Sequence, residues 1–171
     1  RRAEPAERME SWLLQSRDGL SWTPLSQIQT TNGDETALLF EPDGVLMAVA
    51  RCGGGAPAQF CRAQPPYTDW TRIDLDRAVG GPLLARWGDR HLVGGRKRLG
   101  DAPPTCALYW LENDQLREAA VLPSGGDTSY PGFVQLSPTQ GLLSYYSSHE
   151  GSGTSLAPSA IYLADLSLVD R

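Results

Sequence analysis

Three stretches of the chain repeat one pattern: a short apolar run, a turn rich in small and polar residues, and a second apolar run. They read TALLFEPDGVLMAVAR, PLLARWGDRHLVGGR and GFVQLSPTQGLLSYYS, and they begin at residues 36, 82 and 132, which are 46 and 50 residues apart. Further β-rich runs follow each stretch, so each unit predicts a four-stranded antiparallel sheet. A four-stranded repeat of about 40–50 residues is typical of a β-propeller blade. The alternative is a β-sandwich with evenly spaced strands.

The repeats divide residues 1–171 into parts of a single propeller domain. Residues 1–35 would end one blade, 36–80 and 81–128 would each form a blade, and 129–171 would form the last. These are about three blades, fewer than the about four to eight of a closed propeller. Either earlier blades precede Arg1 or two copies complete a ring, and a first residue other than Met favours earlier blades. No long helical pattern is convincing in the chain; the best candidate is the first ten residues, and Pro5 weakens it.

Charge and hydropathy argue against two kinds of partner. The chain has 15 Lys and Arg against 20 Asp and Glu, a net charge of −5, whereas binding nucleic acid needs a basic face. No run approaches 18 consecutive apolar residues, so no membrane span is expected, and no signal-like segment is present. The sequence leaves the native compartment undefined.

The three cysteines, Cys52, Cys61 and Cys106, contain no close pair of the kind that binds zinc. We therefore expect no metal, and no feature of the sequence calls for a cofactor. Cys52 and Cys61 flank a predicted hairpin, and they either form a disulfide or stay as buried thiols.

The stretch SRDGLSW, residues 16–22, resembles the Asp-box of the sialidase (neuraminidase) superfamily with one residue deleted. The resemblance implies a six-bladed β-propeller, of which about three blades would be present. Ser16 and Asp18 are expected to accept hydrogen bonds from turn amides, and Gly19 to take a positive φ. Trp22 is expected to pack under the blade.

Four further positions resemble the sialidase active site in their order and spacing. Glu35 opens an inner strand, and Arg51 closes the next strand 16 residues later. Arg96 ends the second strand of the following blade, with Arg98 as the local alternative. Tyr130 stands just before an inner strand, 34 residues after Arg96. The resemblance implies that Tyr130 is the catalytic nucleophile and Glu35 its base, and that Arg51 and Arg96 bind a substrate carboxylate.

The chemistry of sialic acid gives such a set a reason. This sugar carries a carboxylate beside its anomeric carbon, and arginine forks bind carboxylates bidentately. A carboxylate nucleophile would repel that group, whereas a tyrosine hydroxyl would not, and sialidases are an exception that uses tyrosine. Because a phenol has a pKa of about 10, it needs a base beside it, which is the role implied for Glu35.

Each of these side chains also has a structural interpretation. Glu35 would then be a strand-end acid paired with an arginine, and Tyr130 an aromatic cap on the core. Arg51 and Arg96 would be solvated strand-end arginines, and Asp127 would only cap a turn.

The chain also departs from the sialidase pattern. The family's first arginine and its general-acid aspartate would lie before Arg1, and Pro131 follows Tyr130 where the family has a hydroxyl residue. The sequence predicts a retaining, exo-α-sialidase-like glycoside hydrolase, present as its C-terminal half, with a sialoside or related glycan as substrate. The alternatives are a non-catalytic propeller that binds carbohydrate or protein, and a fragment that dimerises into a six-bladed ring.

Overall fold

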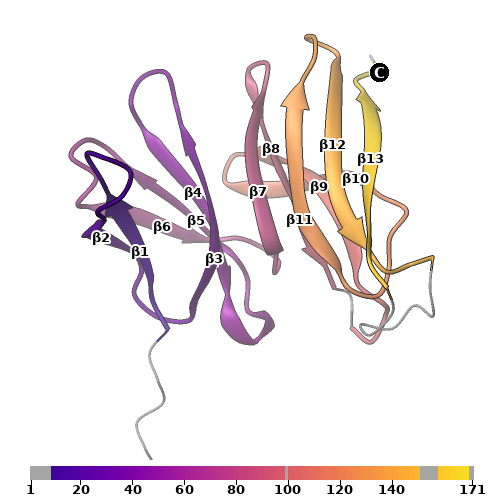
Figure 1. Cartoon of the computed structure of the whole chain (residues 1–171), viewed down its shortest axis with the longest axis horizontal. Coiled ribbons are helices and arrows are strands. Elements are labelled where there is room, and N and C mark those ends of the chain that lie inside the picture. Colours follow the sequence, from indigo (N-terminus) through magenta and orange to yellow (C-terminus); the bar gives the residue numbers. More distant parts are fainter. Residues whose placement is uncertain (1–8, 99, 151–157, 170–171) are drawn as a thin grey trace, which may run out of the picture.

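The computed structural model describes residues 9–98, 100–150 and 158–169, which form thirteen β-strands in four antiparallel sheets (Figure 1). The 3-10 turn η1 (Gly53–Gly55) follows the fourth strand. The strands are β1 (Ser11–Gln15), β2 (Thr23–Gln29), β3 (Gly33–Phe40), β4 (Leu46–Cys52), β5 (Gln59–Ala63), β6 (Trp70–Asp74), β7 (Gly80–Trp87), β8 (Arg90–Lys97), β9 (Thr105–Glu112), β10 (Gln115–Val121), β11 (Thr128–Gln135), β12 (Gln140–Ser147) and β13 (Ala160–Ser167).

The sheets follow one another in chain order. Strands β1 and β2 form a two-stranded sheet, β3–β6 and β7–β10 form four-stranded sheets, and β11–β13 form a three-stranded sheet. Within each sheet, neighbouring strands are also neighbours in sequence. The all-β propeller prediction is confirmed. The sandwich alternative is wrong, because a sandwich packs two sheets face to face, whereas four sheets here stack in series (Figure 1).

The first strands of the three larger sheets lie side by side. Strand β7 packs against both β3 and β11, and the hairpin turns that end these three strands all point to the top of Figure 1. Each of the three strands therefore begins at the same end of the molecule. That end carries the candidate site.

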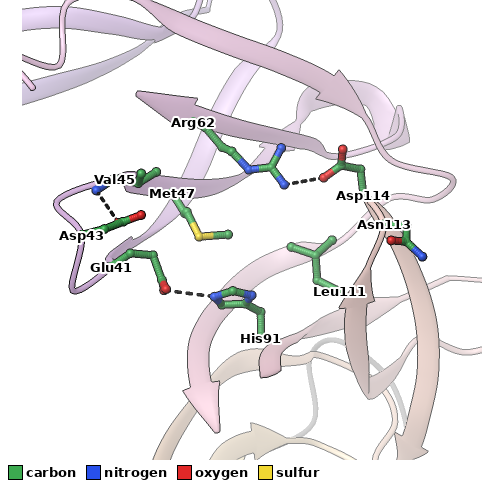
Figure 2. Close-up of a pocket in the computed structure, with 9 residues that line it drawn as sticks. All are labelled: Glu41, Asp43, Val45, Met47, Arg62, His91, Leu111, Asn113 and Asp114. Atoms are coloured by element: carbon green, nitrogen blue, oxygen red, sulfur yellow. Dashed lines mark hydrogen bonds and ion pairs between the residues drawn. The ribbon is translucent and has the colours of Figure 1, made fainter. Parts of the chain in front are cut away.

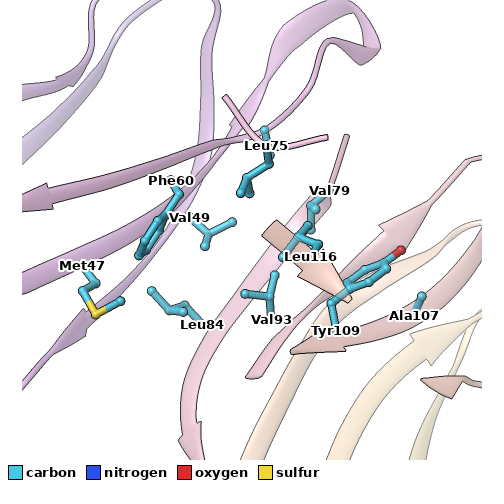
Figure 3. Close-up of a cluster of buried hydrophobic side chains, with 11 residues drawn as sticks. Met47, Val49, Phe60, Leu75, Val79, Leu84, Val93, Ala107, Tyr109 and Leu116 are labelled. Carbon is cyan, nitrogen blue, oxygen red and sulfur yellow. The ribbon is translucent and has the colours of Figure 1, made fainter. Parts of the chain in front are cut away.

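The apolar core is divided among the spaces between successive sheets. Figure 3 shows the middle space, where Met47 and Val49 of β4 face Leu84 and Val93 of the next sheet. A second cluster lies between β7–β10 and β11–β13, and a third between β1–β2 and β3–β6. Because β4 supplies alternate side chains to two of these clusters, it reads as the continuous apolar run LMAVA instead of alternating with polar residues.

Both end sheets present apolar side chains to solvent. On the outer face of the last sheet, Val134, Ile161 and Leu163 are 59%, 80% and 69% exposed. On the first sheet, Trp12 and Leu14 are each 46% exposed, on the face opposite buried Leu13. Large exposed apolar faces are typical of surfaces that pack against a partner. Either further blades or a second copy of the chain would cover such a face.

Charging the outer face of β13 should reduce self-association of the isolated chain. We expect the double variant Ile161→Asp, Leu163→Asp to lower the weight-average mass measured by sedimentation, because aspartate on this face opposes apolar contact. Leu20→Asp is the matched control, since Leu20 is 88% exposed in the turn after β1. A wild-type chain that is monomeric at every concentration would contradict the expectation.

The Asp-box turn agrees with the sequence in all but one side chain. The Ser16 hydroxyl accepts from the amide of Gly19, and the Asp18 carboxylate from those of Leu20 and Ser21. Gly19 has φ +73°. The prediction for Trp22 is wrong: its side chain is 58% exposed, because it precedes the exposed start of β2, where the sheet has only two strands.

The remaining predictions concern the cysteines and the N-terminus. All three cysteines are buried free thiols, so the disulfide alternative is wrong. The helix candidate at the N-terminus falls mainly on residues 1–8, which lie outside the described residues. Within the described part of the chain, no helix is long and apolar enough to cross a membrane.

Candidate active site

The first strand of each large sheet carries a β-bulge near its start. Two residues of the bulged strand face one residue of the neighbouring strand in each case. The bulged pairs are Asp34–Glu35 in β3, Gly81–Pro82 in β7 and Tyr130–Pro131 in β11. Bulges redirect side chains at the ends of sheets. Since β7 packs against both other strands, the three bulges meet and form the base of the candidate site.

Tyr130 lies inside β11, not before it. The strand begins at Thr128, and Tyr130 has φ +49°, in the left-handed region that few non-glycine residues occupy. The bulge also explains Pro131, which leaves the ladder without a donor at a position that is unpaired in any case. Pro131 is buried against Gly94, where an added Cβ would come within 3.0 Å of its ring.

The Glu35 carboxylate accepts hydrogen bonds from all three large sheets. The Tyr130 hydroxyl donates to Oε1. The Arg51 guanidinium donates to Oε2 at 2.7 Å, and the Gly81 amide to the same oxygen at 3.1 Å. Arg51 also lies 3.3 Å from Asp34. The structure therefore brings three of the four predicted site residues into direct contact.

Arg96 belongs to a neighbouring cluster and does not touch Glu35 or Tyr130. Its guanidinium donates to the Thr128 carbonyl at 2.8 Å and to the Asp127 carboxylate at 2.9 Å. The Tyr146 hydroxyl also donates to Asp127, at 2.9 Å. The Tyr146 ring stacks on Tyr130 with 6.0 Å between centroids. Arg96 is thus linked to Tyr130 through Tyr146. Asp127 holds both partners, which is more than the turn cap considered from sequence.

The hydrogen bond between Tyr130 and Glu35 determines where the proton resides. Partial burial alone would raise the pKa of the Glu35 carboxyl, but the hydrogen bonds from Arg51 and then Tyr130 outweigh burial and lower this pKa. The same bond to Glu35, with burial second, raises the pKa of Tyr130 to about 12. In the unliganded site the phenol keeps its proton and the carboxylate stays ionised.

The ionisation of Tyr130 should therefore be detectable as a late alkaline step. We expect the ultraviolet phenolate signal, taken as wild type minus Tyr130→Phe, to have a midpoint of about 12, and Glu35→Gln to move it toward the ordinary value of about 10. Because folding raises this pKa, the associated stabilisation is present below the ordinary pKa and is lost as pH rises through the raised one. For Glu35, whose pKa is lowered, it is present above the ordinary value and lost as pH falls. A midpoint of about 10 in the wild type would contradict the hydrogen bond.

Arg51 and Arg96 line one cavity of about 700 Å³, which Arg98 also lines. Arg98 is exposed and, among the described residues, forms no ion pair, so Arg96 is the arginine connected to Tyr130. A separate cavity of about 530 Å³ lies at the other end of the same two sheets, beside the hydrogen bond between Glu41 and His91 (Figure 2). Its residues are remote from the bulges, because Glu41 follows the far end of β3.

Sequence reasoning missed three contributors to the site. Gly81 supplies an amide to Glu35, while Asp127 and Tyr146 fix Arg96. Gly81 occupies the same bulge position in its strand as Tyr130 does in β11, and both precede a proline. This shared pattern was the available signal. No group of three or more His, Cys, Asp or Glu residues that could hold a metal occurs among the described residues.

Solved structures resemble the whole described fold. A protein of unknown function from Dyadobacter fermentans matches with a TM-score of 0.73 and 22% identity, over 92% of this chain and 45% of that one. An α-L-arabinanase from Penicillium chrysogenum, complexed with arabinobiose, matches at 0.62 and 12% over 95% and 52%. An α-L-arabinofuranosidase from Fusarium graminearum, in complex with an iminosugar inhibitor, matches at 0.61 and 10% over 92% and 49%. No family model and no curated protein matches by sequence.

These likenesses show the fold, because every identity is below 25%. The chain resembles part of β-propeller glycoside hydrolases and spans about half the length of the structures that it matches. The enzymes named above act on arabinose-containing substrates by their names, so the match does not single out sialidases.

Proposed function

We propose that the three bulges form the catalytic face of a retaining glycoside hydrolase that acts on an acidic sugar, with a sialoside as the best candidate. The observation that carries the proposal is the hydrogen bond from the Tyr130 hydroxyl to Glu35, whose other oxygen binds Arg51. A tyrosine nucleophile suits a substrate that carries its own carboxylate, because a carboxylate nucleophile would meet like charge.

In the proposed reaction, Glu35 removes the proton from the Tyr130 hydroxyl as the phenolic oxygen bonds to the anomeric carbon. The bond from that carbon to the leaving oxygen breaks, and its electron pair goes to that oxygen, which is protonated by an acid that the family pattern supplies from an earlier blade. Water then attacks the same carbon and gives a proton to the conjugate base of that acid, and Glu35 returns its own proton to the departing phenolate. Two displacements retain the anomeric configuration.

Arg51 has two roles in this scheme. In the unliganded site it pairs with Glu35 and Asp34. A substrate carboxylate placed against its guanidinium would compete for those donors and weaken the hold on Glu35, which makes Glu35 a stronger base. Arg96, 19% exposed and fixed by Asp127, would supply a second donor at the same cavity.

The second candidate is a glycosidase for neutral arabinose-containing glycans, which the structural matches favour. A panel of fluorogenic α-sialoside and α-L-arabinofuranoside, tested on the full-length protein, separates the two. Release from the sialoside supports the proposal, and release from the arabinoside alone replaces it with the second candidate. Sialoside binding without turnover would indicate a carbohydrate-binding propeller.

A further inference from the structure

The cavity shared by Arg51 and Arg96 gathers arginines in a chain that is acidic overall. Four arginines line it, namely Arg51, Arg77, Arg96 and Arg98. The first three pair with carboxylates, whereas Arg98 forms no ion pair within the described part of the chain. The chain as a whole carries a net charge of −5. Arginines gathered around one cavity raise the local concentration of anions and bind them through charge-assisted hydrogen bonds.

Two of these guanidinium groups are held in place by other contacts. Arg77 donates from Nε to Asp76 at 3.0 Å and lies 5.1 Å above the ring of buried Tyr109. Arg96 is fixed by the Thr128 carbonyl and the Asp127 carboxylate. Donors that are already ordered lose little conformational entropy when a ligand binds.

One wall of the cavity leaves room for a ligand. Gly54 and Gly55 line it, and a Cβ added at either would meet nothing within 4 Å. Gly80 also lines the cavity, and the next residue, Gly81, donates its amide to Glu35. The cavity therefore adjoins the Tyr130–Glu35 pair and extends away from it.

We propose that this cavity binds a second anionic group, carried by the unit of the glycan next to the acidic sugar at Tyr130. The group is a carboxylate, as in a second acidic sugar, or a sulfate ester, and both offer the oxygens that guanidinium forks bind. The inference rests on the proposed function, since it places the first acidic sugar at Tyr130 and Glu35. It goes further by naming the substrate as a glycan with two neighbouring negative charges.

The test compares the binding of three probes to the full-length protein carrying Tyr130→Phe, which prevents turnover. The probes are sialyllactose, sialyllactose with a sulfate ester on its galactose, and a disaccharide of two linked sialic acids. We expect at least one doubly charged probe to bind about tenfold more tightly than sialyllactose, with an advantage that shrinks as salt increases. The probe with the larger advantage identifies the anionic group.

Variants then test which arginines cause the tighter binding of the doubly charged probe. Arg98→Gln, which alters an exposed side chain, and Arg77→Gln should each remove much of it. Arg117→Gln is the matched control, because Arg117 also pairs with a carboxylate, Glu112, but lies on β10 outside this cavity. Equal affinity for all three probes, or an advantage that survives both cavity variants, overturns the inference and leaves the proposed function standing. Failure of every probe to bind overturns both.

Discussion

Replacing Tyr130 by phenylalanine should lower the turnover of an α-sialoside by about 1,000-fold or more and change sialoside affinity by less than about threefold. The substitution removes only the hydroxyl that donates to Glu35. The ring remains, with its stacking on Tyr146. A loss confined to kcat therefore reports the nucleophile, whereas a distorted pocket would also weaken binding. Steady-state kinetics with a fluorogenic sialoside on the full-length protein measure both quantities.

Two companion variants make this result specific. Glu35→Gln should also lower kcat, because a neutral amide cannot accept the phenol proton. Tyr162→Phe should change nothing, since Tyr162 stacks on Tyr145 on the opposite side of the last sheet from Tyr130. Activity that survives Tyr130→Phe would assign the nucleophile to another group and return Tyr130 to the aromatic cap considered from sequence.

In the proposed reaction, the electrostatics of the unliganded site require that the substrate take part. The Tyr130 pKa is raised to about 12, chiefly by the bond to Glu35, so the phenol is a poor nucleophile before substrate arrives. Arg51 keeps the Glu35 pKa low, which makes Glu35 a weak base. Under the proposal, a substrate carboxylate that draws Arg51 away from Glu35 would raise the Glu35 pKa toward its ordinary value. A neutral sugar would not do so, and this argument favours an acidic substrate over arabinose.

The grouping of strands into successive sheets could be predicted from sequence, because each sheet is built from consecutive strands of the chain. The two apolar runs of each repeat correspond to the first two strands of a large sheet, since neighbours in each sheet are neighbours in the chain and hairpin turns mark their ends. The predicted starts of the inner strands lie a few residues too far along the chain. The repeats begin at residues 36, 82 and 132, whereas the strands begin at Gly33, Gly80 and Thr128. The bulges cause this difference, because glycine, proline and an extra residue interrupt the period-two pattern just where the strands begin.

The site itself was predictable only in part. The resemblance indicated Glu35 and Tyr130, which are 95 residues apart and in contact in the structure. The resemblance did not indicate that Tyr146 and Asp127 would bind Arg96, because these roles depend on contacts between neighbouring strands. Such contacts arise from the register of the strands and the stacking of sheets, and neither leaves a periodic signal in the sequence.

Adding a single methyl group at Gly81 should damage both stability and the site. A Cβ there would lie 2.2 Å from Ser129 Oγ and 3.0 Å from Tyr130 Cδ1, at φ +52°. We expect Gly81→Ala to lower the free energy of unfolding by about 2–4 kcal/mol, from the left-handed backbone and the overlap together. Gly88→Ala is the matched control, because Gly88 begins the turn directly after the same strand, has φ +65°, and an added Cβ there would meet nothing within 4 Å. Gly88→Ala should lower the free energy of unfolding by about 1 kcal/mol, from the left-handed backbone alone.

A second substitution separates the loss of stability caused by the added methyl group from its effect on the site. Ser129→Ala removes the oxygen at 2.2 Å but leaves the contact with the Tyr130 ring at 3.0 Å. In the double variant Gly81→Ala, Ser129→Ala, stability measured by denaturant unfolding should partly recover, while sialoside turnover stays low because the ring remains displaced from Glu35. Full recovery of turnover would mean that Gly81 only avoids Ser129. Equal stability losses for Gly81→Ala and Gly88→Ala would mean that the inner strands yield at the bulge, and that the positions of Glu35 and Tyr130 are not fixed by close packing at Gly81.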